Sequence, residues 1–223
     1  MSDTLLAISR SLSADVQTLA TISHNVANMN TPGYRGTRAI PEFGDQLRVR
    51  SALDQGDGGL KQTDRSLDLA LRGPGFFVVE RDGVPLLTRA GEFRVDGEGL
   101  LVTSGGDRVL GTSGPIAMPP GEVRIDTQGE IWSGSQAVDR VYVVSATDAS
   151  RLRPMGGGAY AYDGQLEAWS GSVMQGALER SNVDPAEQTV RLMETTRHAE
   201  SVQRAISIYD KAMGTGINSL GEN

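Results

Sequence analysis

Two segments with a seven-residue hydrophobic repeat lie at opposite ends of this 223-residue chain. In the first, one apolar row starts at Leu5, and a second row follows three positions later with Asp15 as its polar member. In the other segment, the repeat runs back from Leu220. So narrow a stripe is typical of a coiled-coil seam rather than of a helix packed on its own core. We therefore predict an assembly interface formed by Leu5, Ile8, Leu12, Leu19, Ile22, Val26, Met29, Leu192, Val202, Ile206, Tyr209, Met213 and Leu220.

Asp15 interrupts the second row, and it allows two interpretations. It is either a polar contact that sets the helix register or a solvated residue beside which Val16 takes the buried position. Because a buried, unpaired carboxylate is costly, the second interpretation is favoured. Packing of both helices on one internal core would also produce an apolar stripe, but neither helix shows the wider apolar face which that arrangement needs.

The ends of both helices carry recognisable signals. The first helix is predicted over residues 4–29, and Thr31-Pro32-Gly33 after it favours a type II turn. The second is predicted to begin at Asp184, which can cap it, with Pro185 in the first helical position. Glu187 stands where it can complete a capping box.

Between the helices the pattern changes to short apolar runs separated by turn signals. Asp82-Gly83 is a strong hairpin signal, and similar pairs recur throughout the segment. Such frequent turns favour an antiparallel sheet or barrel over parallel β/α units. The chain is therefore predicted to be α+β, with terminal coiled-coil-like helices packed together and a central antiparallel β domain. The expected segments are 1–33 (N-terminal helical half), 34–64 (extended connector with one strand near 47–50), 65–178 (central β domain) and 179–223 (C-terminal helical half).

Composition and motifs exclude several classes of function. The net charge of −7 argues against nucleic-acid binding and against an anionic membrane surface. The chain has no cysteine and no long apolar run, and its N-terminus lacks a signal-peptide pattern, so any export is expected without a cleaved signal. His24 and His198 lie off the seams and are interpreted as solvated or interface residues rather than metal ligands. The segments 96–99 and 126–130 favour hairpin turns over calcium loops. We expect no catalytic, cofactor or metal site.

Four segments together carry a resemblance to a known family. They are 22–35, 65–77, 88–103 and 176–183, which contain the strings Ile-Ser-His-Asn-Val-Ala-Asn, Thr-Pro-Gly-Tyr-Arg and Gly-Ala-Leu-Glu-Arg-Ser-Asn-Val. In this order they resemble the bacterial flagellar rod and hook proteins. The residues that match the terminal motifs of the family are Asn25, Asn28, Thr31, Pro32, Gly33, Tyr34, Ser181, Asn182 and Val183.

The resemblance implies a structural subunit of the flagellar rod, the tubular drive shaft that crosses the periplasm. The terminal helices would line the tube around the export channel, and the partners would be other rod subunits, further copies of this chain and the export apparatus, with no nucleic acid and no membrane insertion. The chain length favours the two middle-sized rod proteins of the family, and the short segment 34–61 favours the one with the shorter connector. A secreted coiled-coil adhesin and a wall-degrading hydrolase are the alternatives from other classes.

Overall fold

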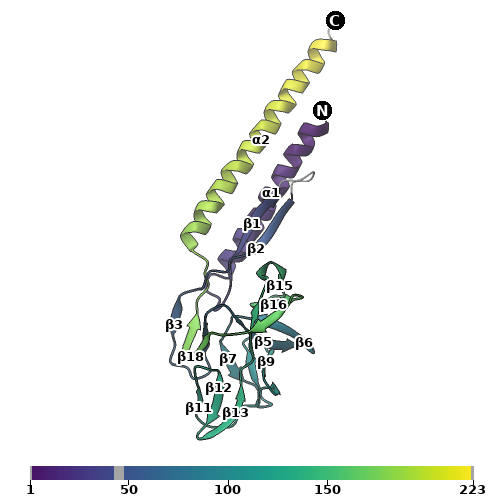
Figure 1. Cartoon of the computed structure of the whole chain (residues 1–223). Coiled ribbons are helices and arrows are strands. Elements are labelled where there is room, and N and C mark those ends of the chain that lie inside the picture. Colours follow the sequence, from purple (N-terminus) through teal and green to yellow (C-terminus); the bar gives the residue numbers. More distant parts are fainter. Residues whose placement is uncertain (1, 43–47, 222–223) are drawn as a thin grey trace. The chain divides into compact units, whose positions relative to one another are not determined.

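The computed structural model describes residues 2–42 and 48–221 and has an α+β fold (Figure 1). The chain divides into two compact units. The helical unit comprises Met1–Ala27, Thr37–Ala52 and Asp184–Asn223, and the β unit comprises Asn28–Gly36 and Leu53–Val183. The predicted combination of a helix at each end with a large antiparallel β region between them is confirmed.

The helical unit contains α1 (Ser2–Ala27) and α2 (Pro185–Gly221). These helices contact each other and run in opposite directions (Figure 1). Beside α1, β1 (Thr37–Glu42) pairs with β2 (Arg48–Leu53). The predicted cap of α2 is confirmed, because the Asp184 carboxylate accepts a hydrogen bond from the backbone N–H of Ala186 at 2.8 Å. Glu187 instead accepts a hydrogen bond from Arg191, one turn further along, so the predicted capping box is wrong.

The β unit is built from short antiparallel strands. The main sheet has the order β15-β16-β6-β5-β9-β8-β7, with β10 beside β9, β14 beside β5 and β17 beside β14. Three smaller sheets have the orders β11-β12-β13, β18-β4 and β19-β3. The bounds are β3 Leu60–Gln62, β4 Leu69–Arg72, β5 Phe76–Arg81, β6 Val84–Thr88, β7 Phe93–Val95, β8 Leu101–Thr103, β9 Arg108–Gly111, β10 Gly114–Pro115, β11 Val123–Ile125, β12 Glu130–Ser133, β13 Gln136–Arg140, β14 Val143–Ala146, β15 Leu152–Pro154, β16 Ala159–Tyr162, β17 Leu166–Ala168, β18 Ser172–Gln175 and β19 Ala177–Glu179, with a 3₁₀ turn at Ala149–Arg151.

The turns follow the sequence signals. Asp82 and Gly83 have φ values of 52° and 78°, as a two-residue hairpin between β5 and β6 requires. The carboxylates of Asp96 and Asp126 each accept hydrogen bonds from two backbone N–H groups of their own loops. These loops are therefore hairpin turns, as predicted.

The core of the β unit is apolar and closely packed. Phe77 and Phe93 are fully buried, and their rings meet edge to face with centroids 5.2 Å apart. A second cluster gathers around Phe76 and Tyr160, whose centroids are 6.2 Å apart. Phe77 and Phe93 belong to a first cluster, whose other members are buried aliphatic residues from β4, β5, β6, β8, β9, β11, β12, β16 and β18, together with Ile116 and Val141.

The connector 34–64 has more structure than predicted. We expected one strand near residues 47–50, and β2 lies there, although Leu47 is outside the described residues. β1 and β3 are additional strands. The side chains of β3 are exposed, and its pairing partner is β19, more than one hundred residues further along the chain. Local periodicity could not reveal β3, because its strand character comes from that distant backbone pairing.

Candidate functional site: the helix rows and a buried charge cluster

The contact between α1 and α2 includes Asp15 of the second row, which faces His198, and Asn25, which faces Gln188. Asp15, Ile22 and Asn25 of α1 are buried, as are Gln188 and Thr195 of α2. Ile22 is the one apolar side chain among these five. Among the described side chains, the buried centre of the helical unit is therefore mostly polar.

The favoured interpretation of Asp15 is wrong. Both carboxylate oxygens of Asp15 lie 2.9 Å from Nδ1 of His198 on α2, whereas Val16 is 59% exposed. The carboxylate can be buried because the second helix supplies a polar partner 183 residues away in the sequence. Asp15 thus makes the polar helix-to-helix contact of the alternative interpretation. His198 lies at this contact, as an interface histidine, and His24 is exposed.

Asn25 of the N-terminal motif joins three elements of the helical unit. Its Oδ1 accepts a hydrogen bond from the backbone N–H of Thr37 at 2.9 Å, and its Nδ2 donates to the Thr37 carbonyl at 2.8 Å. Nδ2 also lies 3.2 Å from Oε1 of Gln188. A groove of about 290 Å³, lined partly by Thr18 and Thr195, lies beside these residues. The motif asparagine therefore holds β1 and α2 against α1.

The predicted interface residues differ in exposure. Ile22 is buried, and Val26 and Leu192 are 42% and 44% exposed. The side chains of Leu5, Met213 and Leu220 lie outside the described part. The half-buried members are Ile8, Leu12, Leu19, Met29, Val202, Ile206 and Tyr209. Further exposed apolar residues on the two helices are Leu6, Val16, Val190, Met193 and Ile208.

The other motif residues lie in the β unit, where the N- and C-terminal motifs meet. Gly33 has φ +67°, and a Cβ atom there would overlap the backbone of Arg89 and Ala90. The N–H of Gly33 donates to the Glu179 carbonyl at 2.8 Å. Asn182 accepts a hydrogen bond from the Gly36 N–H at 2.7 Å through its side-chain oxygen. These contacts explain why glycine and asparagine occupy their places in the motifs.

The remaining motif residues make local contacts. The Thr31 hydroxyl lies 3.3 Å from the side-chain oxygen of Asn28. The Tyr34 carbonyl accepts a hydrogen bond from the Asn182 N–H at 3.3 Å. The Ser181 hydroxyl accepts one from the N–H of Val183 at 3.2 Å, and Pro32 is half-buried.

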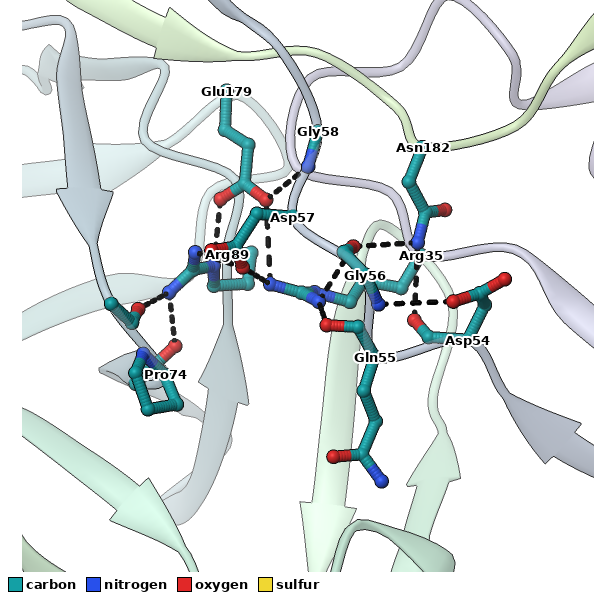
Figure 2. Close-up of polar contacts among 12 residues, drawn as sticks. Arg35, Asp54, Gln55, Gly56, Asp57, Gly58, Pro74, Arg89, Glu179 and Asn182 are labelled. Carbon is teal, nitrogen blue, oxygen red and sulfur yellow. Dashed lines mark hydrogen bonds and ion pairs between the residues drawn. The ribbon is translucent and has the colours of Figure 1, made fainter.

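A cluster of charged residues, which sequence reasoning missed, lies next to these motifs (Figure 2). We define the charge cluster as Arg35, Asp57, Arg89 and Glu179. The Nε of Arg89 donates to Glu179 at 2.7 Å, and Nη2 of Arg35 lies 3.4 Å from the other oxygen of the same carboxylate. Asp57 lies 2.8 Å from Arg35 and 3.3 Å from Arg89. Three of the members are buried, and the side chain of Asp57 is 57% exposed.

The electrostatics of the cluster are dominated by burial. Burial lowers the pKa of Arg89, while the attraction to Glu179 raises it. The carbonyls of Gly73 and Gly75 each accept a hydrogen bond from Nη1 of Arg89 at 2.8 Å. The signal in the sequence was the position of these charges within the family segments, since Arg35 lies in 22–35, Arg89 in 88–103 and Glu179 in 176–183.

The contacts of Asn25 and of the charge cluster hold distant parts of the chain together. In residues 2–42 and 48–221 there is no group of three or more His, Cys, Asp or Glu side chains that could hold a metal ion. Across the described part of the chain, no helix is long and apolar enough to cross a membrane.

Comparison with known proteins supplies the family. Residues 6–35 match the model of the flagella basal body rod protein, residues 70–133 the D1 domain of the flagellar hook protein FlgE/F/G, and residues 174–220 the C-terminal region of the flagellar basal body rod FlgEFG protein. The chain is 32% identical to the flagellar basal-body rod protein FlgF of Escherichia coli K12, covering 93% of this chain and 95% of that protein. The FlgF of Salmonella typhimurium is 31% identical over the same shares. The FlgG of Buchnera aphidicola from Schizaphis graminum is 28% identical, with 86% and 90% covered.

Proposed function

This chain belongs to the flagellar basal-body rod proteins of the FlgF type, and from that premise we propose that its terminal helices join neighbouring subunits into the tube of the rod. As a member of that family it is a structural subunit of the flagellar basal body and not an enzyme. The two middle-sized rod proteins of the family are FlgF and FlgG, and the short segment 34–61 of this chain favours FlgF.

The exposure of the apolar rows is the observation that supports this assembly. Val26 and Leu192 belong to the predicted seams, and nearly half of each side chain faces solvent. Burying apolar surface contributes roughly 25 cal/mol per Å², so a neighbour that covers these rows is bound favourably. Coiled-coil packing of the rows, within and between subunits, is part of the proposal. Contacts that repeat from subunit to subunit build an open helical tube.

The proposal extends to partners and place. The partners are other rod subunits, further copies of this chain and the export apparatus, and nucleic acid and membrane insertion have no part in it. We place the subunit in the periplasm-spanning rod and expect export without a cleaved signal peptide. As a division of the sequence, the proposal keeps 1–33, 34–64, 65–178 and 179–223. The compact units differ from it, because 28–36 and 179–183 belong to the β unit and Thr37–Ala52 to the helical unit.

The proposal can be tested with substitutions that spare the isolated subunit. Val26→Asp and Leu192→Asp place a charge on side chains that are already half exposed, so the folded chain should tolerate them. In a strain that lacks the native chain, we expect neither variant to restore complete rods in electron micrographs of basal bodies. Ala20→Asp, at an exposed position of α1 off the apolar rows, is the matched control and should restore them.

Two results would contradict different parts of the proposal. Complete rods built from Val26→Asp and Leu192→Asp subunits would remove these rows from the assembly surface. Normal basal bodies and swimming in the strain without any copy of the chain would remove the rod assignment itself.

A further inference from the structure

The charge cluster joins distant parts of the sequence. Glu179 is 90 residues from Arg89 and 144 residues from Arg35 along the chain. Each of these three residues also lies in a different one of the three segments that match family models. The cluster is therefore complete only when the N-terminal, central and C-terminal parts of the chain have met.

Within the cluster, Glu179 is the buried counter-ion. The side chains of Arg89 and Arg35 are 0% and 6% exposed, and that of Glu179 is 3% exposed. Asp57, the other carboxylate, is mostly in solvent, which weakens its attraction for the two arginines. Without Glu179, two buried guanidinium groups would face each other with one half-exposed carboxylate. A buried charge that lacks its partner is strongly unfavourable.

Arg89 connects β6 to the turn between β4 and β5. It directly follows β6, whose Leu86 and Leu87 are buried in the two core clusters. Its hydrogen bonds to the carbonyls of Gly73 and Gly75 also tie it to the turn between β4 and β5. The core strands therefore enclose this guanidinium when they come together.

From these observations we infer that Glu179 is a folding latch, because the core of the β unit closes only when β19 brings this carboxylate to Arg89 and Arg35. Synthesis proceeds from the N-terminus, so nearly all of the core strands exist before Glu179 does. The latch delays closure of the β unit until the C-terminal part of the chain is present. In an exported rod subunit, as proposed above, this delay would favour passage as an unfolded chain, but the latch itself does not depend on that function.

The latch makes a kinetic prediction for the full-length chain. Both tryptophans, Trp132 and Trp169, lie in the β unit, so fluorescence after dilution from urea follows its folding. If closure requires the carboxylate, Glu179→Gln slows refolding by at least about tenfold and changes the unfolding rate less than about threefold. Asp57→Asn is the matched control, and its refolding rate should stay within about threefold of the native chain's because Asp57 is largely solvated.

The opposite kinetic result would overturn the inference. Refolding of Glu179→Gln at the native rate, with faster unfolding, would show that the ion pair forms after the barrier and is only a structural contact. Should Glu179→Gln not fold at all, the triple variant Arg35→Met/Arg89→Met/Glu179→Leu removes all three buried charges, and we expect it to regain native fluorescence. A triple variant that also stays unfolded would contradict the latch, because no buried charge of the cluster then needs to be neutralised.

Discussion

The two units of this protein use apolar side chains in different ways. In the β unit, Phe77 and Phe93 are completely buried against each other. In the helical unit, the buried residues between α1 and α2 are mostly polar, while Val16, Val26 and Leu192 are exposed. The β unit thus buries most of its large apolar side chains in its own core, although some, such as Val84, Met155 and Leu166, are exposed. The helical unit leaves apolar surface that a neighbouring subunit can cover, which is what an assembly element requires.

The largest expected effect concerns the β core. Phe77→Ala removes a ring with no exposed surface from its edge-to-face contact with Phe93. The cavity should lower the free energy of unfolding by about 3–5 kcal/mol, measured by urea titration of tryptophan fluorescence. Val84→Ala, at a position 55% exposed on β6, should change it by less than about 0.5 kcal/mol. If both substitutions lowered the free energy of unfolding by similarly small amounts, the result would contradict the description of the β unit as stabilised by its own apolar core.

The next effect is a loss of folding stability at alkaline pH. Burial raises the pKa of the Tyr160 hydroxyl from 10.0 to about 12. Folding therefore favours the protonated form of Tyr160. Its contribution to the free energy of unfolding is complete below pH 10 and is lost as the pH rises towards 12. The loss should reach at most about 2.7 kcal/mol at the upper end. Tyr160→Phe should flatten this slope in unfolding titrations, and an unchanged slope would show that Tyr160 is not its source.

A somewhat smaller effect is expected at Gly33. Its positive φ and its close approach to the backbone of Arg89 leave no room for a Cβ atom. Gly33→Ala should therefore destabilise the β unit by about 2 kcal/mol in the same titration. Gly97→Ala, whose added methyl would meet nothing within 4 Å, is the control for loss of a loop glycine. Equal effects of the two substitutions would mean that the contact at Gly33 does not constrain the chain.

The smallest effect should appear in the helical unit. Asp15→Ala removes the hydrogen bonds to His198 and should cost about 1 kcal/mol, seen as a lower melting temperature of the far-ultraviolet circular dichroism signal. Val16→Ala, next to it, should have almost no effect because Val16 is exposed. If Val16→Ala were the more damaging change, the contact between α1 and α2 would depend on Val16 rather than on Asp15.

Much of the fold could be predicted because its signals are local. The Asp82-Gly83 hairpin, the cap at Asp184 and the approximate extent of both helices follow from neighbouring residues. The first helix spans Ser2–Ala27 rather than the predicted 4–29. The errors arose where a partner is distant. Asp15 is buried because His198 faces it, and β3 is a strand because β19 pairs with it.

The charge cluster shows the same limit at the candidate site. Arg35, Arg89 and Glu179 carry no local pattern that assigns them to one another, although each stands in a recognisable motif. The motifs could identify the family from the sequence, but the contact that unites them required the three-dimensional structure.

The central claim, that neighbouring subunits cover the exposed apolar rows, can be measured directly because the native chain has no cysteine. A single cysteine at position 26 or 192 would be treated with a maleimide in the free chain and in isolated basal bodies, with the denatured chain as reference. We predict rapid labelling of both positions in the free chain and strong protection in basal bodies, with continued labelling of an Ala20→Cys control. Equal labelling of positions 26 and 192 in the two states would contradict the account.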